Sequence, residues 1–481
     1  MSNGKRVLVI GGGPAGSTAA ALLAKSGVQV RLLEREVFPR YHIGESLLPS
    51  CKSLLKLSGA LEKVEEHGFV VKRGSLFRWG DDEWVLDWAK LVDSQAWTWE
   101  VERDKYDEIL LRNAADQGAD VVEGATVKRV VFNDAGRPTA VEWVGRDSDT
   151  VHTEHFDYLI DASGRAGVLA NQHFKIRQSH EVFQNIAVWG YWRGAKLLPG
   201  TPDGGFNGLS SPNGWYWHIP LTEDRFSIGF VTHKKTFAER RNNFDSLKDF
   251  YLDRIKACAP LHGLLDEATL LNGDSGDPIR AEQDFSYVAE RFCGPGYLMV
   301  GDSACFLDPL LSTGVHLAQF SALLGAATVS SIFNGDLSEE ESLAFFEYAY
   351  RRAYTRLLVL VSRMYERYEG ADDFFWQSQR LVHEQVRYDD QPVRNFTEII
   401  AGMTDLREAE STDTRALTQL LLADADESQV TAPQGPDRKH FPGLEVSVLW
   451  NIYRDPAGVD AKMKDIQVVT EPRVGLVRQA A

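Results

Sequence analysis

Cysteine is scarce in this chain of 481 residues, with four at positions 51, 258, 293 and 305. None of the four forms a C-x-x-C pair, and none lies at zinc-finger spacing from a histidine. The count and spacing exclude a disulfide-stapled scaffold and give no support for a metal site. We therefore expect free thiols, no bound metal and a reducing compartment.

Long apolar runs are also missing from the sequence. The best candidate near residue 360, Leu357–Val361, is flanked by Arg356 and Arg363 and falls short of the roughly 18 residues of a membrane helix. At the start, the apolar stretch Val7–Ile10 is followed by glycines instead of a signal-peptide core. We expect no membrane association and a cytoplasmic location.

Positive charge is in deficit. The chain has 52 basic and 69 acidic side chains, for a net charge of −17. A polyanion is repelled by such a protein on average, so nucleic acids and anionic membranes are poor partners.

The beginning of the chain has the pattern of a βαβ unit. An apolar, β-branched run at 6–10 predicts a buried strand, residues 14–26 are rich in small helix formers, and 28–34 predicts a second strand. Two strands joined by a helix indicate a parallel sheet and an α/β fold.

A glycine-rich turn joins the first strand to the helix. The run Gly11-Gly12-Gly13-Pro14-Ala15-Gly16 fits G-x-G-x-x-G, which allows a dinucleotide pyrophosphate close to the backbone at a helix N-terminus. Glu34, at the end of the second strand, is placed to accept hydrogen bonds from ribose hydroxyls. The pattern predicts a dinucleotide site at Gly11, Gly13, Pro14, Ala15, Gly16 and Glu34.

Three later segments narrow the choice of dinucleotide. Arg103 precedes a predicted helix, Asp161 follows a predicted buried strand, and the pair Gly301-Asp302 follows another. Their order resembles that of FAD-dependent monooxygenases and their relatives. The resemblance implies bound FAD, with Arg103 near the pyrophosphate and Gly301-Asp302 near the ribityl chain.

Residues 214–220, Gly-Trp-Tyr-Trp-His-Ile-Pro, place two tryptophans two residues apart, on one face of a predicted strand. The segment resembles the W-x-W-x-I-P signature of the flavin-dependent halogenases. In that family Trp215 and Trp217 would form a wall that separates the organic substrate from the flavin. A second likeness is the segment 68–74, whose Lys72 matches the lysine that presents electrophilic halogen to the substrate.

The segment from Gly301 to Val315 also resembles the family, which implies a halide site at the backbone of Thr313 and Gly314. Halogenases of free tryptophan carry a glutamate where this chain has Leu311. This departure favours an activated ring, a phenol or a pyrrole. The loop after the second strand, Phe38–Ser46, also resembles the family. The resemblance implies that this loop, especially Ile43–Ser46, links the flavin and halide sites, with Arg40, Ile43 and Gly44 among the flavin-binding residues.

The expected fold is α/β: a Rossmann-type FAD-binding domain (1–175, with 285–330 returning to it), an inserted β-rich substrate domain (176–284) and a mainly helical C-terminal region (331–481). The resemblance implies that a separate flavin reductase supplies FADH2, that O2 and chloride or bromide are consumed, and that the substrate is a small aromatic molecule, either free or tethered to a carrier protein. The basic stretch Arg351–Arg356 could dock such a carrier, or be an ordinary helix face. A FAD-dependent hydroxylase and a flavin-dependent reductase remain as alternatives.

Overall fold

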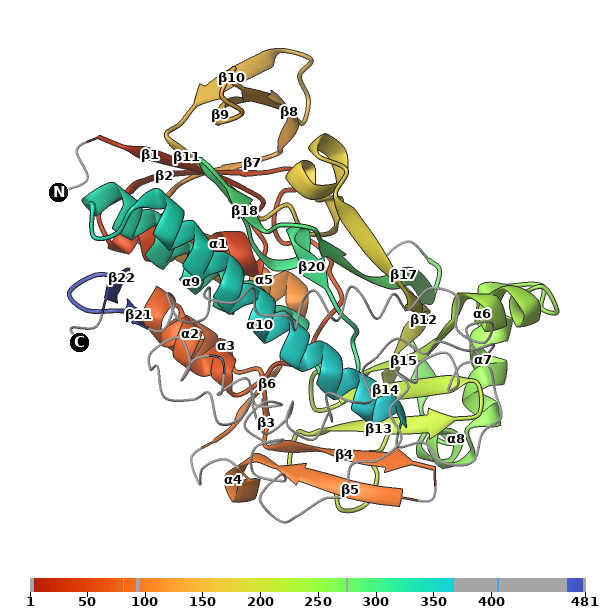
Figure 1. Cartoon of the computed structure of the whole chain (residues 1–481). Coiled ribbons are helices and arrows are strands. Elements are labelled where there is room, and N and C mark those ends of the chain that lie inside the picture. Colours follow the sequence, from red (N-terminus) through yellow and green to blue (C-terminus); the bar gives the residue numbers. More distant parts are fainter. Residues whose placement is uncertain are drawn as a thin grey trace, which may run out of the picture.

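The computed structural model describes residues 4–80, 82–91, 96–273, 276–366, 405 and 465–478 (Figure 1). The βαβ unit is confirmed. Its strands belong to a six-stranded sheet of order β18-β19-β11-β1-β2-β7, in which every pair is parallel except β18–β19. The strands are β1 (Arg6–Ile10), β2 (Gln29–Glu34), β7 (Asp120–Glu123), β11 (Tyr158–Asp161), β18 (Cys293–Gly294) and β19 (Tyr297–Met299).

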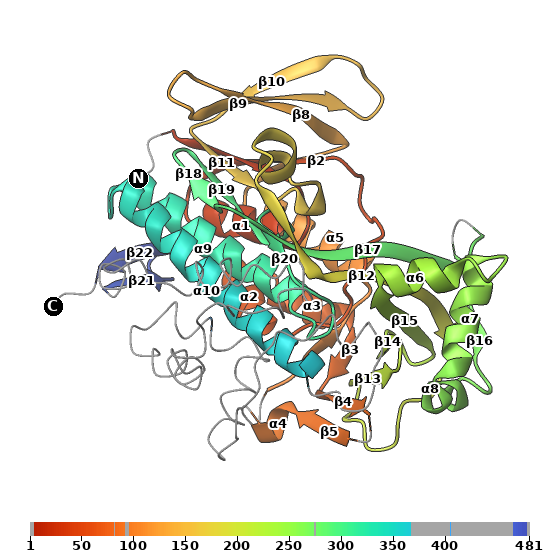
Figure 2. The ribbon, with the colours of Figure 1, turned by 45° about the vertical axis from the view of Figure 1, so that its right-hand side comes forward.

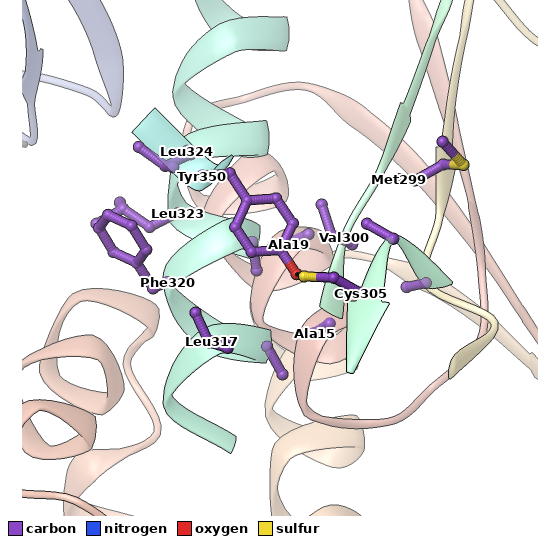
Figure 3. Packing of buried hydrophobic residues seen from close by; sticks show 14 of the residues in the cluster. Ala15, Ala19, Met299, Val300, Cys305, Leu317, Phe320, Leu323, Leu324 and Tyr350 are labelled. Carbon is purple, nitrogen blue, oxygen red and sulfur yellow. Dashed lines mark hydrogen bonds between the residues drawn. The ribbon is translucent and has the colours of Figure 1, made fainter. Parts of the chain in front are cut away.

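Four long helices accompany this sheet: α1 (Pro14–Lys25), α5 (Arg103–Asp116), α9 (Gly314–Asn334) and α10 (Glu339–Glu366). Figure 2 shows α9 and α10 lying side by side. Leu317 and Phe320 of α9, with Ala15 and Ala19 of α1, belong to the same buried apolar cluster (Figure 3). This packing holds the starts of α1 and α9 in one body.

Helix α9 corrects the expectation that no segment of the chain is long and apolar enough for a membrane helix. It is the one helix of the described residues that is long and apolar enough to cross a membrane, with a mean hydropathy of 1.3 over its best 18-residue window. Serines, a glycine and a histidine interrupt this stretch, so the sequence shows no continuous apolar run there. In the structure 94 % of the window is buried inside the protein, so the packing of the core accounts for its apolar character.

A second, nine-stranded sheet is separate from the first, as expected. Its order is β20-β17-β12-β15-β14-β13-β4-β5, with β16 pairing β12. The strands are β4 (Gly74–Trp79), β5 (Asp82–Asp87), β12 (Arg177–Arg193), β13 (Phe206–Ser211), β14 (Gly214–Pro220), β15 (Arg225–His233), β16 (Thr269–Leu270), β17 (Ile279–Ala289) and β20 (Cys305–Phe306).

This sheet extends beyond the segment 176–284, because β4 and β5 come from residues 74–87. That segment is also not β-rich throughout, since it contains α6 (Lys234–Arg241), α7 (Leu247–Ala257) and α8 (Ala259–Leu264). Apolar side chains of α7 and α8 pack in one cluster with Tyr216 and Phe230 of the sheet. The three helices cover a face that the β-pattern alone left without a partner.

Smaller elements complete the fold. A three-stranded sheet lies at one end of the molecule, and a two-stranded ribbon joins β3 to β6. These elements are α2 (Ser50–Ser58), α3 (Leu61–His67), β3 (Val70–Lys72), α4 (Trp88–Leu91), β6 (Thr98–Glu100), β8 (Ala125–Phe132), β9 (Pro138–Gly145), β10 (Val151–His155), η1 (Gly164–Ala166), η2 (Val168–His173) and η3 (Gly301–Ser303).

The described part of the region 331–481 contains helix α10, Asp405 and a hairpin of β21 (Ile466–Val469) and β22 (Gly475–Arg478). The hairpin packs on α9, where the Ser331 hydroxyl accepts the N–H of Leu476 at 2.6 Å. The expectation of a mainly helical region otherwise concerns residues outside those described.

Candidate active site

The glycine-rich turn has the shape that close approach of a phosphate requires. Gly11 has a φ of +102°, and a Cβ placed on it would lie 2.3 Å from the carbonyl oxygen of Ala162. A Cβ on Gly16 would lie 1.9 Å from the carbonyl oxygen of Gly11. At Gly13, in contrast, the nearest atom of the described residues would be Nη2 of Arg40, at 3.5 Å. Within the described structure the turn is therefore closed by backbone at Gly11 and Gly16 and open beside Gly13.

Pro14 and Ala15 begin α1 directly after this opening, so the free N–H groups of the first helical turn border it. The residues present thus fit the pyrophosphate of a dinucleotide such as FAD.

Glu34 lies against the same turn. It is buried at the end of β2, and its two carboxylate oxygens accept the N–H groups of Gly12 (2.5 Å) and Glu36 (2.7 Å). Each oxygen can still accept a second hydrogen bond. The ribose-binding role of Glu34 stays a prediction, and the structure adds that this carboxylate also fixes the turn.

Arg40 and Arg103 meet at one carboxylate, that of Asp107. Arg103 binds Asp107 through two hydrogen bonds, of 2.7 and 2.9 Å, and Arg40 forms an ion pair with it at 2.9 Å. Burial raises the pKa of Asp107, but the guanidinium of Arg103, then that of Arg40, holds it below its ordinary value. Arg103 also donates to the carbonyl oxygens of Ile43 (2.7 Å) and Gly44 (3.0 Å). One arginine thereby ties α5 to the segment 38–49, which we name the connecting loop.

The two later strand ends return to the glycine-rich turn. A Cβ on Gly301 would lie 3.0 Å from the Cβ of Ala15, so this glycine is beside the start of α1. Burial raises the pKa of the adjacent Asp302 to about 6, against the lowering effect of Arg165 and Arg103. The carboxylate of Asp161 instead accepts the N–H groups of Ser163 and Leu169 at 3.0 and 2.7 Å. Its side chain therefore shapes the turn after β11.

The connecting loop also contacts β12 of the large sheet. The indole N–H of Trp189 donates to the Tyr41 hydroxyl at 2.8 Å. The Tyr191 hydroxyl lies 2.9 Å from that of Tyr41 and donates to Glu45 at 2.8 Å. Burial raises the pKa of Glu45 to about 7, although the neighbouring Ser227 and Tyr191 hydroxyls lower it.

Trp215 and Trp217 lie on one face of β14, as their spacing predicts. Both side chains are buried in the same apolar cluster, with ring centroids 6.2 Å apart. Trp189 extends the row, since its ring centroid is 6.2 Å from that of Trp217. The indole N–H of Trp217 donates to Ser227 at 3.1 Å, and its ring lies over Gly229 of β15.

Gly229 therefore sets the position of Trp217. A Cβ at residue 229 would lie 2.1 Å from the indole ring. We expect Gly229→Ala to displace the ring and to lower the free energy of unfolding by about 1–3 kcal/mol, as overpacking does. Urea denaturation measures this loss. Gly263→Ala, in α8, is the control, because no atom of the described residues lies within 4 Å of its added methyl group. Equal stability of the two variants would contradict the assigned contact.

Lys72, the last residue of β3, is fully buried. Its Nζ donates to Ser46 Oγ at 2.7 Å and to the carbonyl oxygen of Leu47 at 3.0 Å, both in the connecting loop. Its nearest carboxylate is Glu100 of β6, with Nζ 3.9 Å from Oε1. Burial lowers the pKa of Lys72, and Glu100 opposes that shift.

Aromatic rings connect Lys72 to the tryptophan pair. Nζ of Lys72 lies 4.9 Å from the ring centroid of Phe206, which is 5.4 Å from that of Phe77. Trp79 follows at 6.4 Å, and Trp215 lies a further 6.4 Å away. The lysine and the tryptophans are thus two ends of one buried aromatic row.

The predicted halide turn lies at the start of α9. Thr313 is buried and precedes the helix, Gly314 is its first residue, and Ser312 has a φ of +58°, which side chains rarely adopt. Leu311 is buried beside them. Ser50 Oγ, at the start of α2, lies 2.9 Å from Nδ1 of His316. The start of α2, directly after the connecting loop, is therefore in contact with the start of α9.

Sequence reasoning missed several of these residues. Glu45 and Ser46 lie in a segment that was recognised, but no side-chain role was assigned to them. Glu100 and Tyr191 carried no motif at all. Strand pairing brings Glu100 and Tyr191 into the site, and no local sequence pattern indicates that pairing.

The basic stretch of α10 is engaged within the protein. Arg351 pairs with Glu347 and donates to the carbonyl oxygen of Glu290 at 3.0 Å, while buried Arg356 pairs with Asp405. These contacts favour a structural face over a docking site.

Comparison with known proteins identifies the class. The sequence model of the family described as "Tryptophan halogenase" matches residues 6–94 and 85–432. A "Tryptophan 2-halogenase" of Chondromyces crocatus is 38 % identical over 100 % of this chain and 95 % of that protein. A "Flavin-dependent halogenase" of Armillaria mellea is 39 % identical over 76 % of this chain and 73 % of that protein.

Solved structures agree. A myxobacterial chondrochloren halogenase, described as a new variant of FAD-dependent halogenases, superposes with a TM-score of 0.74 at 32 % identity, covering 87 % of this chain and 97 % of that one. The flavin-dependent halogenase CmlS gives 0.72 at 30 % identity, covering 93 % and 77 %. These relatives favour a halogenase over the hydroxylase and reductase alternatives. The family model and the relatives that match over most of its length show that the chain belongs to the flavin-dependent halogenases.

Proposed function

We propose that this halogenase transfers chlorine or bromine to an electron-rich aromatic ring, with Lys72 presenting the halogen. One observation carries the proposal: the connecting loop contacts three of the parts that the reaction needs. It meets Arg103 at Ile43 and Gly44, the tryptophan row at Tyr41, and Lys72 at Ser46. A single segment thus joins the flavin side of the protein to the lysine.

The protein's own residues would divide the work. Gly11, Gly13 and Gly16 with Glu34 would hold the FAD, and Arg40 and Arg103 would border its pyrophosphate. Reduced FAD, delivered by a separate flavin reductase, would supply with O2 the oxidant that converts a halide ion to hypohalous acid. The N–H groups at Thr313 and Gly314 would hold that halide at the positive end of the α9 dipole.

Lys72 would receive the hypohalous acid away from bulk water. An unprotonated amine binds or is halogenated by hypohalous acid, and burial lowers the pKa of Lys72 in the direction that favours this form. The rings of Trp215 and Trp217 would keep the organic substrate apart from the flavin, so that halogen and not oxygen is transferred.

The class of ring is the finer part of the proposal. Leu311 stands where halogenases of free tryptophan carry a glutamate, so this position provides no carboxylate beside the substrate. A phenol or a pyrrole is activated enough to react without that help. Tryptophan is the second candidate, because the full-length relative is named a tryptophan 2-halogenase, and position 2 of an indole lies in its pyrrole ring.

A substrate panel tests the ring class. The purified enzyme, with FAD, a flavin reductase and NaBr or NaCl, would receive equimolar phenol-, pyrrole- and indole-containing probes, including free tryptophan. Mass spectrometry of the mixture reports which probe gains halogen. We expect the phenol or pyrrole probe to react at least about tenfold faster than tryptophan, a difference of about 1.4 kcal/mol in activation free energy. Preferential halogenation of tryptophan would overturn the ring assignment and favour the second candidate.

Carrier tethering is a separate question about the same substrate. The arginines of α10 that could dock a carrier are paired internally, which favours a free substrate. The rates of halogenation of the same probes, free and attached to a carrier protein, would show which form the enzyme uses. Faster turnover of the tethered form would contradict this preference.

A further inference from the structure

Lys72 has a buried partner to which the sequence assigns no role. Register places Lys72 opposite Thr98 and Glu100 opposite Val70 in the antiparallel β3–β6 ribbon. Lys72 and Glu100 are therefore diagonal neighbours on one face, the distance at which long side chains meet. The connecting loop closes the other side of β6, since Ser46 pairs with Glu100 and Leu47 N–H donates to the carbonyl oxygen of Trp99 at 3.1 Å.

Glu100 has unused hydrogen-bonding capacity in a place where that is costly. Its side chain is fully buried, its charged neighbour Lys72 stays 3.9 Å away, and the Ser46 hydroxyl is close enough to lower its pKa. Within the described residues, however, neither carboxylate oxygen accepts a hydrogen bond of normal geometry. Buried carboxylates are ordinarily hydrogen-bonded, and an unmatched one costs free energy. A costly group beside the reactive lysine is more in keeping with a role in the reaction than with stabilisation of the fold.

We propose that Glu100 is the positioning residue of Lys72: its carboxylate takes a proton from the ammonium group and leaves a neutral amine to receive the halogen. The proton moves from Nζ to a carboxylate oxygen of Glu100, which turns an ammonium–carboxylate pair into an amine–carboxylic acid pair with no change in total charge. Glu100 thereby supplies beside Lys72 the carboxylate that Leu311 cannot supply near α9. This inference rests on the proposed role of Lys72.

The surroundings favour such a shared proton. Burial raises the pKa of Glu100 to about 8, against the lowering effect of Lys72 and of the Ser46 hydroxyl, and nearby Glu45 raises it further. Burial lowers the pKa of Lys72, whereas Glu100 and the thiol of Cys51 oppose that shift. The two values are thus brought toward each other, which is the condition for a proton to move between the groups.

Glu100→Gln, which keeps the size and removes the charge, is the direct test. We expect the rate of halogenation to fall about 10²-fold, the lower end of the range for lost acid–base catalysis, while FAD affinity and halide-independent peroxide release stay at the wild-type level. The pH dependence of halogenation that arises from this carboxyl should also disappear. Thr98→Val is the matched control, because it removes a buried hydrogen bond to Leu48 (3.0 Å) from the same strand but leaves the pair intact.

A second readout needs no turnover. Because the folded-state pKa of Glu100 is raised from 4.5 to about 8, the stability that this group contributes is complete below pH 4.5 and is lost as the pH rises through 8. Glutamine does not titrate, so Glu100→Gln does not lose this stability as the pH rises. Without Glu100 the pKa of Lys72 falls further, and this also makes the variant more stable relative to wild type at high pH than at low pH. The Tm of Glu100→Gln relative to wild type should therefore rise by about 3 °C or more between pH 5 and pH 8.5, with and without saturating FAD. For Thr98→Val the difference should not depend on pH.

Wild-type halogenation by folded Glu100→Gln, or a Tm difference that does not change with pH, would overturn the inference. If Glu100→Gln does not fold, Glu100→Asp decides: a carboxylate withdrawn by one methylene should lower the rate of halogenation and keep the pH dependence. An unchanged rate would count against the pair. A wild-type enzyme that fails to halogenate would refute the proposed function instead, and the Tm comparison would still test the pairing.

Discussion

Replacing Lys72 with alanine should abolish halogenation and leave flavin oxidation and peroxide release intact. The amine is the proposed carrier of the halogen and lies apart from the glycine-rich turn, so its loss removes the transfer step without touching the FAD site. We expect halogenated product to fall by about 10³-fold or more, near the upper part of the range for a lost catalytic group. Product by mass spectrometry and peroxide by a coupled colour assay, measured in the same sample, separate the two steps.

Lys72→Met is the matched control for packing, because it keeps most of the volume of the side chain between Phe206 and Trp88 and removes only the amine. Both variants should behave alike. Halogenation that survives in either folded variant would contradict the assignment of Lys72. A parallel loss of peroxide release would instead show that the substitution had damaged the FAD site.

The glycine-rich turn should respond to added methyl groups in a position-dependent way. At Gly16 a methyl group would meet the carbonyl oxygen of Gly11 at 1.9 Å, a clash between backbone segments that cannot relax cheaply. We expect Gly16→Ala to lose FAD binding and at least about 3 kcal/mol of unfolding free energy. At Gly13 no described residue comes closer to the added methyl group than Arg40, at 3.5 Å. Gly13→Ala should fold normally and fill space that we assign to the pyrophosphate.

The FAD affinity of Gly13→Ala should therefore fall at least about tenfold, or 1.4 kcal/mol, at an unchanged Tm. Fluorescence titration with FAD and a thermal melt measure the two quantities. Wild-type FAD affinity in a folded Gly13→Ala variant would contradict the placement of the dinucleotide. Wild-type stability and FAD binding in Gly16→Ala would contradict the backbone contact between Gly16 and Gly11.

Local patterns predicted the parts of the site that depend on neighbours in sequence. The glycine-rich turn, the first βαβ unit and the shared face of Trp215 and Trp217 follow from spacings of two to five residues. The pair of Lys72 and Glu100 does not, because 28 positions separate them and only the β3–β6 register brings them together. The link from Tyr41 to Trp189 spans 148 positions and is equally hidden.

In the fold, too, elements with a clear local pattern were predicted and elements that depend on tertiary packing were not. Helix α9 was missed as an apolar segment because its small and polar residues dilute the signal, although the surrounding α1 and α10 bury it. Helices α6 to α8 were missed because they lie between strong β-strands and carry many charged residues. In both cases tertiary packing, and not the local pattern, supplies the information.

A requirement for halide distinguishes an enzyme that uses FAD chemistry to add halogen from one that adds oxygen. The purified enzyme is supplied with reduced FAD, O2 and an activated phenol, in parallel with chloride, with bromide and without halide, and the products are read by mass spectrometry. We expect a halide-dependent product with the isotope pattern of the added halogen. A product heavier by one oxygen, formed equally without halide, would contradict the proposed function and reduce the tryptophan pair to core packing.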